Sequence, residues 1–143
     1  MGDISRNFSF SEFEHSEKAV ENGITNTIPS AEVRQAIRGL VDTVLQPLRN
    51  GLGVPLIINS GYRCEALNGL LGGAKTSQHR KGEAADIRSP FYSPWGIANM
   101  ILKMGLPFDQ MILYPTFVHV SHKRKGEQRH QVLYDSSYKG NIL

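Results

Sequence analysis

The sequence contains a single cysteine, Cys64, among 143 residues. One thiol excludes an intrachain disulfide and also excludes a zinc site built from several cysteines. Cys64 lies in the segment SGYRCEALN, which carries no recognisable nucleophile motif. We therefore interpret it as a small, half-buried side chain and not as a catalytic nucleophile.

Long apolar runs are also absent. No stretch approaches the roughly 20 apolar residues that span a membrane. The N-terminal segment MGDISRNFSFSEF has no basic start followed by an apolar run, which predicts no secretory signal peptide. We expect neither a membrane nor a membrane anchor among the partners of this chain.

Charge of one sign does not dominate, because 16 Lys and Arg residues face 13 Asp and Glu residues for a formal charge of +3. Basic residues cluster only in HKRKGEQRH, residues 122–130. This distribution argues against a nucleic-acid-binding protein. We interpret the basic segment as a solvated turn. The alternative is that it binds an anionic polymer or phosphate electrostatically.

Helical periodicity marks the first third of the chain. Ser30 can cap a helix whose apolar residues recur at three and four positions, and Pro47 is expected to end or kink this helix. A shorter helix is predicted over residues 12–22, closed by Gly23, and another from the Ser93-Pro94 pair to Met104. The apolar stripe of the long helix comprises Val33, Ile37, Leu40, Val41, Val44, Leu45 and Leu48.

Short strand-like runs follow. VPLIINS (54–60) predicts a buried strand, AADI (84–87) a second, and FDQMILY and FVHVS a tight antiparallel pair around Pro115 and Thr116. HQVLYD (130–135) could add one more strand, and EALNGLLGG (65–73) a brief helix. Helices first and strands later predict an α+β fold, with a small antiparallel sheet flanked by helices. We expect one domain over 1–143, with a helical part at about 8–50 and a second part at about 54–134.

Three side chains suggest a metal site. His79 and Asp86 lie seven residues apart around Gly82, which would let the loop turn tightly. If the valines of FVHVS face the core, His119 points to the opposite side of the same strand. Two imidazoles and one carboxylate would leave one position open on a tetrahedral zinc. The spacing alone is also compatible with ordinary solvated loop residues.

A series of motifs strengthens this hypothesis. In order, these are SGYR (60–63), Asn68, GG (72–73), SQHRKGEAADI (77–87), FDQMI (108–112) and VHVS (118–121). Together with the opening FSFSEFEHSEKAVENGITNTIP and VLQPLR, the series resembles the zinc D-Ala-D-Ala carboxypeptidase family, in particular its short single-domain members from bacteria and phages. The resemblance runs from about Phe8 to Ser121.

The resemblance implies a fold, a cofactor and an activity. It implies the mixed α+β fold that these peptidases share with the signalling domain of Hedgehog proteins, and Zn²⁺ held by His79, Asp86 and His119. It implies a metallopeptidase that cuts a peptidoglycan stem peptide, either as a D-Ala-D-Ala carboxypeptidase or as an endopeptidase of the endolysin type. Such a protein, expected as a monomer, would be made in the cytoplasm of a bacterium or phage-infected cell and would act on the wall after release.

Further residues receive roles on this basis. Arg63 would lie at the substrate and hold a carboxylate or the developing oxyanion, and Ser77 would support the metal-ligand loop. Gln110, Tyr114 and Ser121 are predicted polar liners of the cleft.

The general base is the point at which this chain departs from the family pattern. Many relatives carry a glutamate three positions before the last histidine, where this chain has Thr116, and short members place one where it has Tyr114. Asp109 and His122 are the remaining catalytic candidates. The alternative function is a catalytically impaired, zinc-containing module that binds the cell wall.

Overall fold

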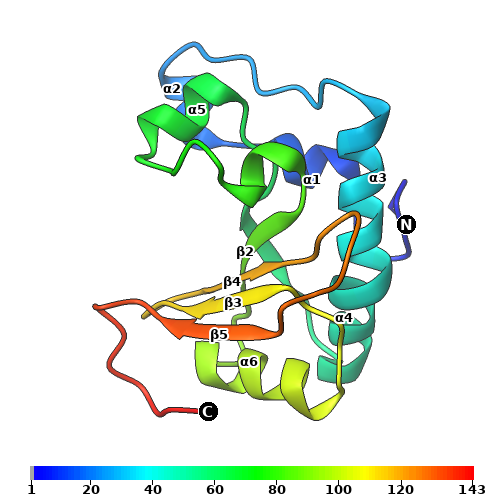
Figure 1. The fold of residues 1–143 in the computed structure, drawn as a ribbon, viewed down its shortest axis with the longest axis vertical. Coiled ribbons are helices and arrows are strands. Elements are labelled where there is room, and N and C mark those ends of the chain that lie inside the picture. The colour runs from blue at the N-terminus through cyan, green and yellow to red at the C-terminus, as the bar shows by residue number, and fades with distance from the viewer. Residues whose placement is uncertain (1) are drawn as a thin grey trace.

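A computed structural model describes residues 2–143 and shows helices gathered around one five-stranded sheet (Figure 1). This arrangement confirms the predicted α+β class. The helices are α1 (Phe10–Glu14), α2 (Glu17–Glu21), α3 (Ala31–Leu40), the π-helical η1 (Val41–Leu45), α4 (Gln46–Leu52), α5 (Glu65–Leu70), the 3₁₀ turn η2 (Gln78–Lys81) and α6 (Pro94–Lys103). The strands are β1 (Ile57–Ser60), β2 (Ala84–Arg88), β3 (Gln110–Leu113), β4 (Val118–Ser121) and β5 (Gln131–Tyr134).

The sheet has the strand order β1-β2-β4-β3-β5 and is mixed, whereas the sequence predicted a small antiparallel sheet. Three of its pairs are antiparallel, and β5 pairs in parallel with β3. β4 already has β2 and β3 on its two sides, and β5 joins the other edge of β3. Because β3 and β4 are antiparallel, the chain leaves β4 beside the start of β3. β5 starts at this same end of the sheet and therefore runs parallel to β3.

The long helical segment continues past Pro47. Ser30 caps α3 as predicted, its Oγ accepting a hydrogen bond from the backbone N–H of Val33 at 3.3 Å. Pro47 has no N–H to donate to the carbonyl four residues earlier, and the wider π-helical turn η1 ends at Leu45, two residues before it. The helix therefore does not end at Pro47, one of the two predicted outcomes, because α4 runs on to Leu52 and closes at Gly53.

The single helix predicted over residues 12–22 is two helices, α1 and α2. The break has a local cause, since Ser16 caps α2 by accepting a hydrogen bond from Ala19 N–H at 3.2 Å. The carbonyl of Phe13 accepts instead from Tyr62 N–H at 2.8 Å, which ties the end of α1 to the segment after β1. The segment VPLIINS was predicted as a buried strand, but β1 is a half-buried edge strand.

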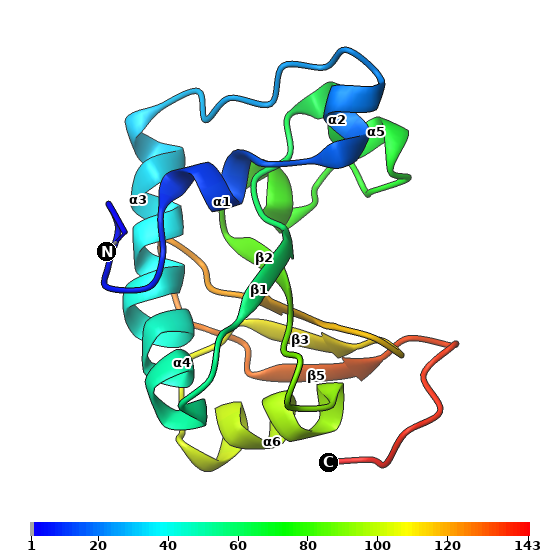
Figure 2. The ribbon, with the colours of Figure 1, turned by 180° about the vertical axis from the view of Figure 1, so that it is seen from behind.

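One face of the sheet is buried against helices and the other is open. Fully buried side chains on the inner face belong to the same core cluster as those of α3, η1, α4 and α6; on the sheet they are Ala85, Ile87, Met111, Leu113, Val118 and Val120. Viewed from behind, α3 to α4 run along one side, while α1, α2 and α5 gather at the end opposite α6 (Figure 2). Asp86 and His119 alternate with the buried residues and so face the other way. Within residues 2–143, no helix combines the length and the apolar character that a membrane crossing needs.

Candidate metal centre

His79 is positioned by the 3₁₀ turn η2 at the entrance to β2. Ser77 begins the turn, its Oγ accepting from His79 N–H at 3.2 Å, and Gly82 ends it in the left-handed region at φ +75°. The His79 ring is buried, and its Nδ1 lies 2.7 Å from the carbonyl oxygen of Gly61. A carbonyl can only accept, so Nδ1 carries the proton and Nε2 keeps a free lone pair. This is the orientation that second-shell hydrogen bonds give to metal-binding histidines.

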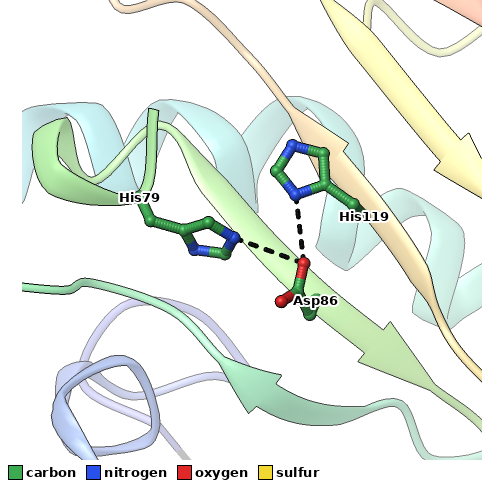
Figure 3. A group of neighbouring side chains, drawn as sticks. All are labelled: His79, Asp86 and His119. Atoms are coloured by element: carbon green, nitrogen blue, oxygen red, sulfur yellow. Dashed lines mark hydrogen bonds and ion pairs between the residues drawn. The ribbon is translucent and has the colours of Figure 1, made fainter. Parts of the chain in front are cut away.

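Asp86 and His119 meet because of strand register. They are directly opposite each other in the antiparallel β2–β4 pair, so their side chains project from the same face. His119 Nδ1 lies 3.0 Å from Asp86 Oδ1, and His79 Nε2 lies 3.3 Å from the same oxygen (Figure 3). One ligand atom from each of the three residues lies within 4.8 Å of the others. The cluster predicted from the sequence is thus a real juxtaposition in space.

The charges of the cluster suit a divalent cation. Burial by itself raises the pKa of Asp86, but the contacts with His119 and His79 outweigh it and hold that pKa well below its usual range. Burial lowers the pKa of His79, so its imidazole is neutral at neutral pH. Zinc requires deprotonated ligands, and two nitrogens with one carboxylate form a common catalytic donor set. The residues present therefore fit this metal.

Arg63 lies beside the carboxylate. Its Nη2 is 3.2 Å from Asp86 Oδ2, and its Nε donates to Ser60 Oγ at 3.0 Å. Ser60 is opposite Asp86 on β1, so three adjacent strands contribute to this part of the site. The guanidinium is mostly buried and fixed in orientation next to the candidate metal ligands.

A cavity of about 460 Å³ opens over the cluster. It is lined by four further residues that the sequence suggested, namely Arg63, Ser77, Gln110 and Tyr114. Others that the sequence did not indicate are Gly73, Ala74, Thr76, Gln78, Ile112 and Arg129. Gln78 lies inside the motif SQH and could have been found from it, whereas Arg129 reaches the cavity only through the unpredicted course of the chain into β5.

Tyr114 lines the cavity and keeps its proton. Its ring stacks on Phe117 with centroids 4.4 Å apart, and burial together with the negative charge of Asp86 raises the pKa of the hydroxyl. The hydroxyl is therefore a hydrogen-bond donor at neutral pH. Thr116, the other position at which the sequence resemblance implied a glutamate, is exposed in the β3–β4 turn and does not line this cavity.

Asp109 does not line the cavity, because its carboxylate is buried and already engaged. Arg129 donates to it through Nε and Nη2, the latter at 2.8 Å, and Gln78 Nε2 donates at 3.1 Å. Burial alone would raise the pKa of Asp109, but the hydrogen bonds from Arg129 lower it to about 2. Ser121 is also buried, with its Oγ accepting from Gln110 N–H at 3.0 Å.

His122, the last catalytic candidate, lies on the other side of β4 from the cluster. Its backbone N–H donates to Glu83 O at 2.8 Å, and its ring lies against Gly39 of α3. Its Nδ1 is buried without a hydrogen bond within residues 2–143, and burial lowers the pKa of the ring. The structure does not bring His122 to the cavity.

Comparison with known proteins completes the description of the site. No curated protein matches the chain significantly. The profile of the family described as Peptidase M15 matches residues 6–121, which is well over half of the chain and includes His79, Asp86 and His119. The chain therefore belongs to the Peptidase M15 family, and membership of this family supports a hydrolase.

Proposed function

We propose that this protein is a zinc metallopeptidase that hydrolyses a peptide bond of bacterial peptidoglycan, as a D-Ala-D-Ala carboxypeptidase or a stem-peptide endopeptidase. The observation that carries the proposal is the convergence of His79, Asp86 and His119, with ligand atoms within 4.8 Å, below a cavity in a chain of a peptidase family. We further propose that it acts as a monomer, and that it is made in the cytoplasm and acts on the wall after release.

The metal and the cavity residues would divide the chemistry between them. When bound, zinc supplies a water with a pKa of about 7 and polarises the scissile carbonyl. The hydrogen bond from His79 to Gly61 O orients the His79 ring so that Nε2 can bind the metal. Ser77 fixes the backbone of the turn that carries His79. These contacts keep the donor atoms oriented before a metal or a substrate arrives.

Arg63 and Tyr114 would stabilise negative charge on the substrate. The Arg63 guanidinium uses two of its nitrogens on Ser60 and Asp86, which fixes the plane in which its remaining N–H groups can bind an oxygen atom. The Tyr114 hydroxyl is a protonated donor in the same cavity. Both groups can donate to a substrate carboxylate or to the oxyanion that develops on the carbonyl, and Gln110 offers a further polar contact.

One observation favours a second function, a catalytically impaired, zinc-containing module that binds the cell wall. Among the residues of 2–143 that line the cavity, Asp86 is the only carboxylate, and it is a candidate metal ligand. Tyr114 stands where short relatives carry a glutamate, and its raised pKa makes it a donor of protons and not an acceptor. A module of this kind would bind zinc and wall peptide without releasing product.

Digestion of purified peptidoglycan separates the two functions. We expect the zinc-loaded wild type to release stem-peptide products, and Asp86→Asn to lose zinc and at least about a hundredfold of the activity. Asp42→Asn is the matched control, because Asp42 is exposed on η1, outside the residues that line the cavity. A wild type that binds zinc and wall peptide, but releases no product from any wall type, would establish the binding module instead.

A further inference from the structure

We propose that Arg129 forms a second anion subsite in the cavity and selects peptides whose internal carboxyl groups are free over peptides in which they are amidated. The inference rests on the proposed function in that the ligand is a stem peptide. It goes beyond that function because it assigns a substrate preference to a residue outside the metal cluster and outside the predicted site.

The first step concerns charge. Two arginines, Arg63 and Arg129, line the cavity together with a single carboxylate, Asp86. Asp86 pairs with Arg63, and the buried Asp109 behind Arg129 is contacted by two cations, Arg129 at 2.8 Å and Lys123 at 3.7 Å. Behind Arg129, Glu83 adds a second carboxylate, since the Gln78 amide donates to both Glu83 and Asp109. The described residues that line the cavity still carry two guanidinium groups and one carboxylate. A bound divalent metal would add to the positive charge of this lining, so the cavity favours a ligand with more than one negative group.

The second step concerns the orientation of Arg129. Its Nε lies 3.1 and 3.2 Å from the two oxygens of Asp109, and its Nη2 lies 2.8 Å from Oδ2. Its backbone N–H also donates to Asp109 Oδ1 at 2.8 Å. Within residues 2–143, Nη1 makes no hydrogen bond. One edge of the guanidinium is thus locked on a buried carboxylate, while Nη1 remains available to a ligand carboxylate.

The third step concerns the backbone. His130, the next residue, has φ +54°, a left-handed conformation that is uncommon for a residue with a side chain. Its ring stacks on Phe108 with centroids 5.5 Å apart, and Gln131 N–H donates to Asp109 O at 3.0 Å. These contacts hold a strained turn directly after Arg129. A left-handed residue of this kind persists where the surrounding contacts fix it, so the turn holds Arg129 in a defined position.

The fourth step links this subsite to the metal cluster. Gln78 Nε2 donates to Asp109 Oδ2 at 3.1 Å, and Gln78 precedes His79 in the turn η2. The same buried carboxylate therefore positions Arg129 and braces the turn that carries a candidate metal ligand. A peptide bound over the cluster lies in the cavity that Arg129 lines, which is the arrangement a specificity-determining side chain requires.

The test uses a synthetic stem pentapeptide that contains D-glutamate and diaminopimelate and ends in D-Ala-D-Ala. It is made in two forms, with the internal carboxyl groups either free or amidated. For the zinc-loaded full chain, we measure the Kd of both forms by calorimetry and kcat/KM by product release. We expect the wild type to prefer the free-acid form by about tenfold to a hundredfold, and Arg129→Gln to bring this ratio close to one.

Two further variants keep the test decisive. Lys125→Gln removes an exposed positive charge from the same loop and should leave the ratio as in wild type. If Arg129→Gln alone unfolds, we use the double variant Asp109→Asn/Arg129→Gln, which removes the buried carboxylate charge together with its partner. Its preference for the free-acid form is then compared with that of the single variant Asp109→Asn. The inference is overturned if the wild type binds both forms equally, or if the preference for the free-acid form is unchanged in Arg129→Gln. Either result counts against it even if hydrolysis is observed. A preference in Kd that depends on Arg129 supports it even if neither form is cut.

Discussion

At the scale of single residues, Tyr114 combines a fixed ring with a protonated hydroxyl in the cavity. Tyr114→Phe keeps the stacking on Phe117 and removes only the oxygen. If the hydroxyl stabilises the developing oxyanion, we expect peptide hydrolysis to fall about a hundredfold, with zinc content and melting temperature unchanged. Product release and metal analysis measure the two effects separately. Tyr134→Phe, on β5 and outside the cavity lining, is the control, and an unimpaired Tyr114→Phe would remove Tyr114 from the mechanism.

Asp109 lies behind the cavity, and its expected contribution is to stability. Its pKa of about 2 in the folded protein is below the ordinary value of 3.8, so its contribution is present above pH 3.8 and is lost as pH falls through about 2. We expect Asp109→Asn to destabilise the protein at neutral pH by about 1–3 kcal/mol. Metal-free protein is unfolded by urea at a series of pH values. If Asp109 instead serves as a catalytic base, its substitution would abolish hydrolysis without this loss of stability.

Residue-scale prediction from the sequence succeeded where a local pattern determines where a side chain points. Alternation along β4 places His119 opposite the buried valines, and Gly82 bends the turn between His79 and Asp86. Arg129 could not be predicted in this way. It lies in a basic segment that looks like a solvated turn, and only its pairing with Asp109, 20 residues earlier, brings it to the cavity.

At the scale of elements, the turn η2 and its closing Gly82 connect the metal site to the core. A Cβ on Gly82 would lie 2.8 Å from Val33 O of α3, and the backbone is in the left-handed region. We therefore expect Gly82→Ala to lower the free energy of unfolding by about 2–4 kcal/mol, from backbone strain and a contact that cannot relax. Zinc affinity should fall as well, because His79 moves with the turn.

Denaturant unfolding and zinc titration test this expectation. Gly69→Ala is the matched control, since a Cβ there meets nothing within 4 Å and the residue lies in the exposed part of α5. This control should be neutral or slightly stabilising. Equal effects at the two glycines would show that η2 does not depend on its close approach to α3.

Element-scale prediction worked for segments with strong periodicity and clear caps, such as α3 and α6. It failed where a tertiary contact decides the outcome. The backbone N–H of Tyr62 donates to the carbonyl of Phe13, which helps to separate α1 from α2. The π-helical turn η1 accommodates Pro47 inside a continuing helix. The parallel pairing of β5 follows from which sheet edge is free, and this cannot be read from the strand's own residues.

At the scale of the whole molecule, the packed side of the sheet supports an opposite side that carries Asp86 and His119, and the turn η2 adds His79 to them. A ligand that binds only the folded state stabilises it, by about 2.7 kcal/mol at a hundredfold excess over Kd. For a chain of this size we expect zinc to raise the melting temperature by roughly 5–10 °C. A chelator should reverse the shift, and Asp86→Asn should show none. A shift that persists in Asp86→Asn would place the zinc elsewhere.

The central claim is that one metal ion binds His79, Asp86 and His119, and anomalous diffraction at the zinc absorption edge tests it most directly. Crystals grown with zinc should show a single strong anomalous peak about 2.0–2.2 Å from His79 Nε2, His119 Nδ1 and an oxygen of Asp86, with one coordination position left for water or substrate. A fully loaded protein with its peak at other residues, or a site closed by a fourth protein ligand, would contradict the account.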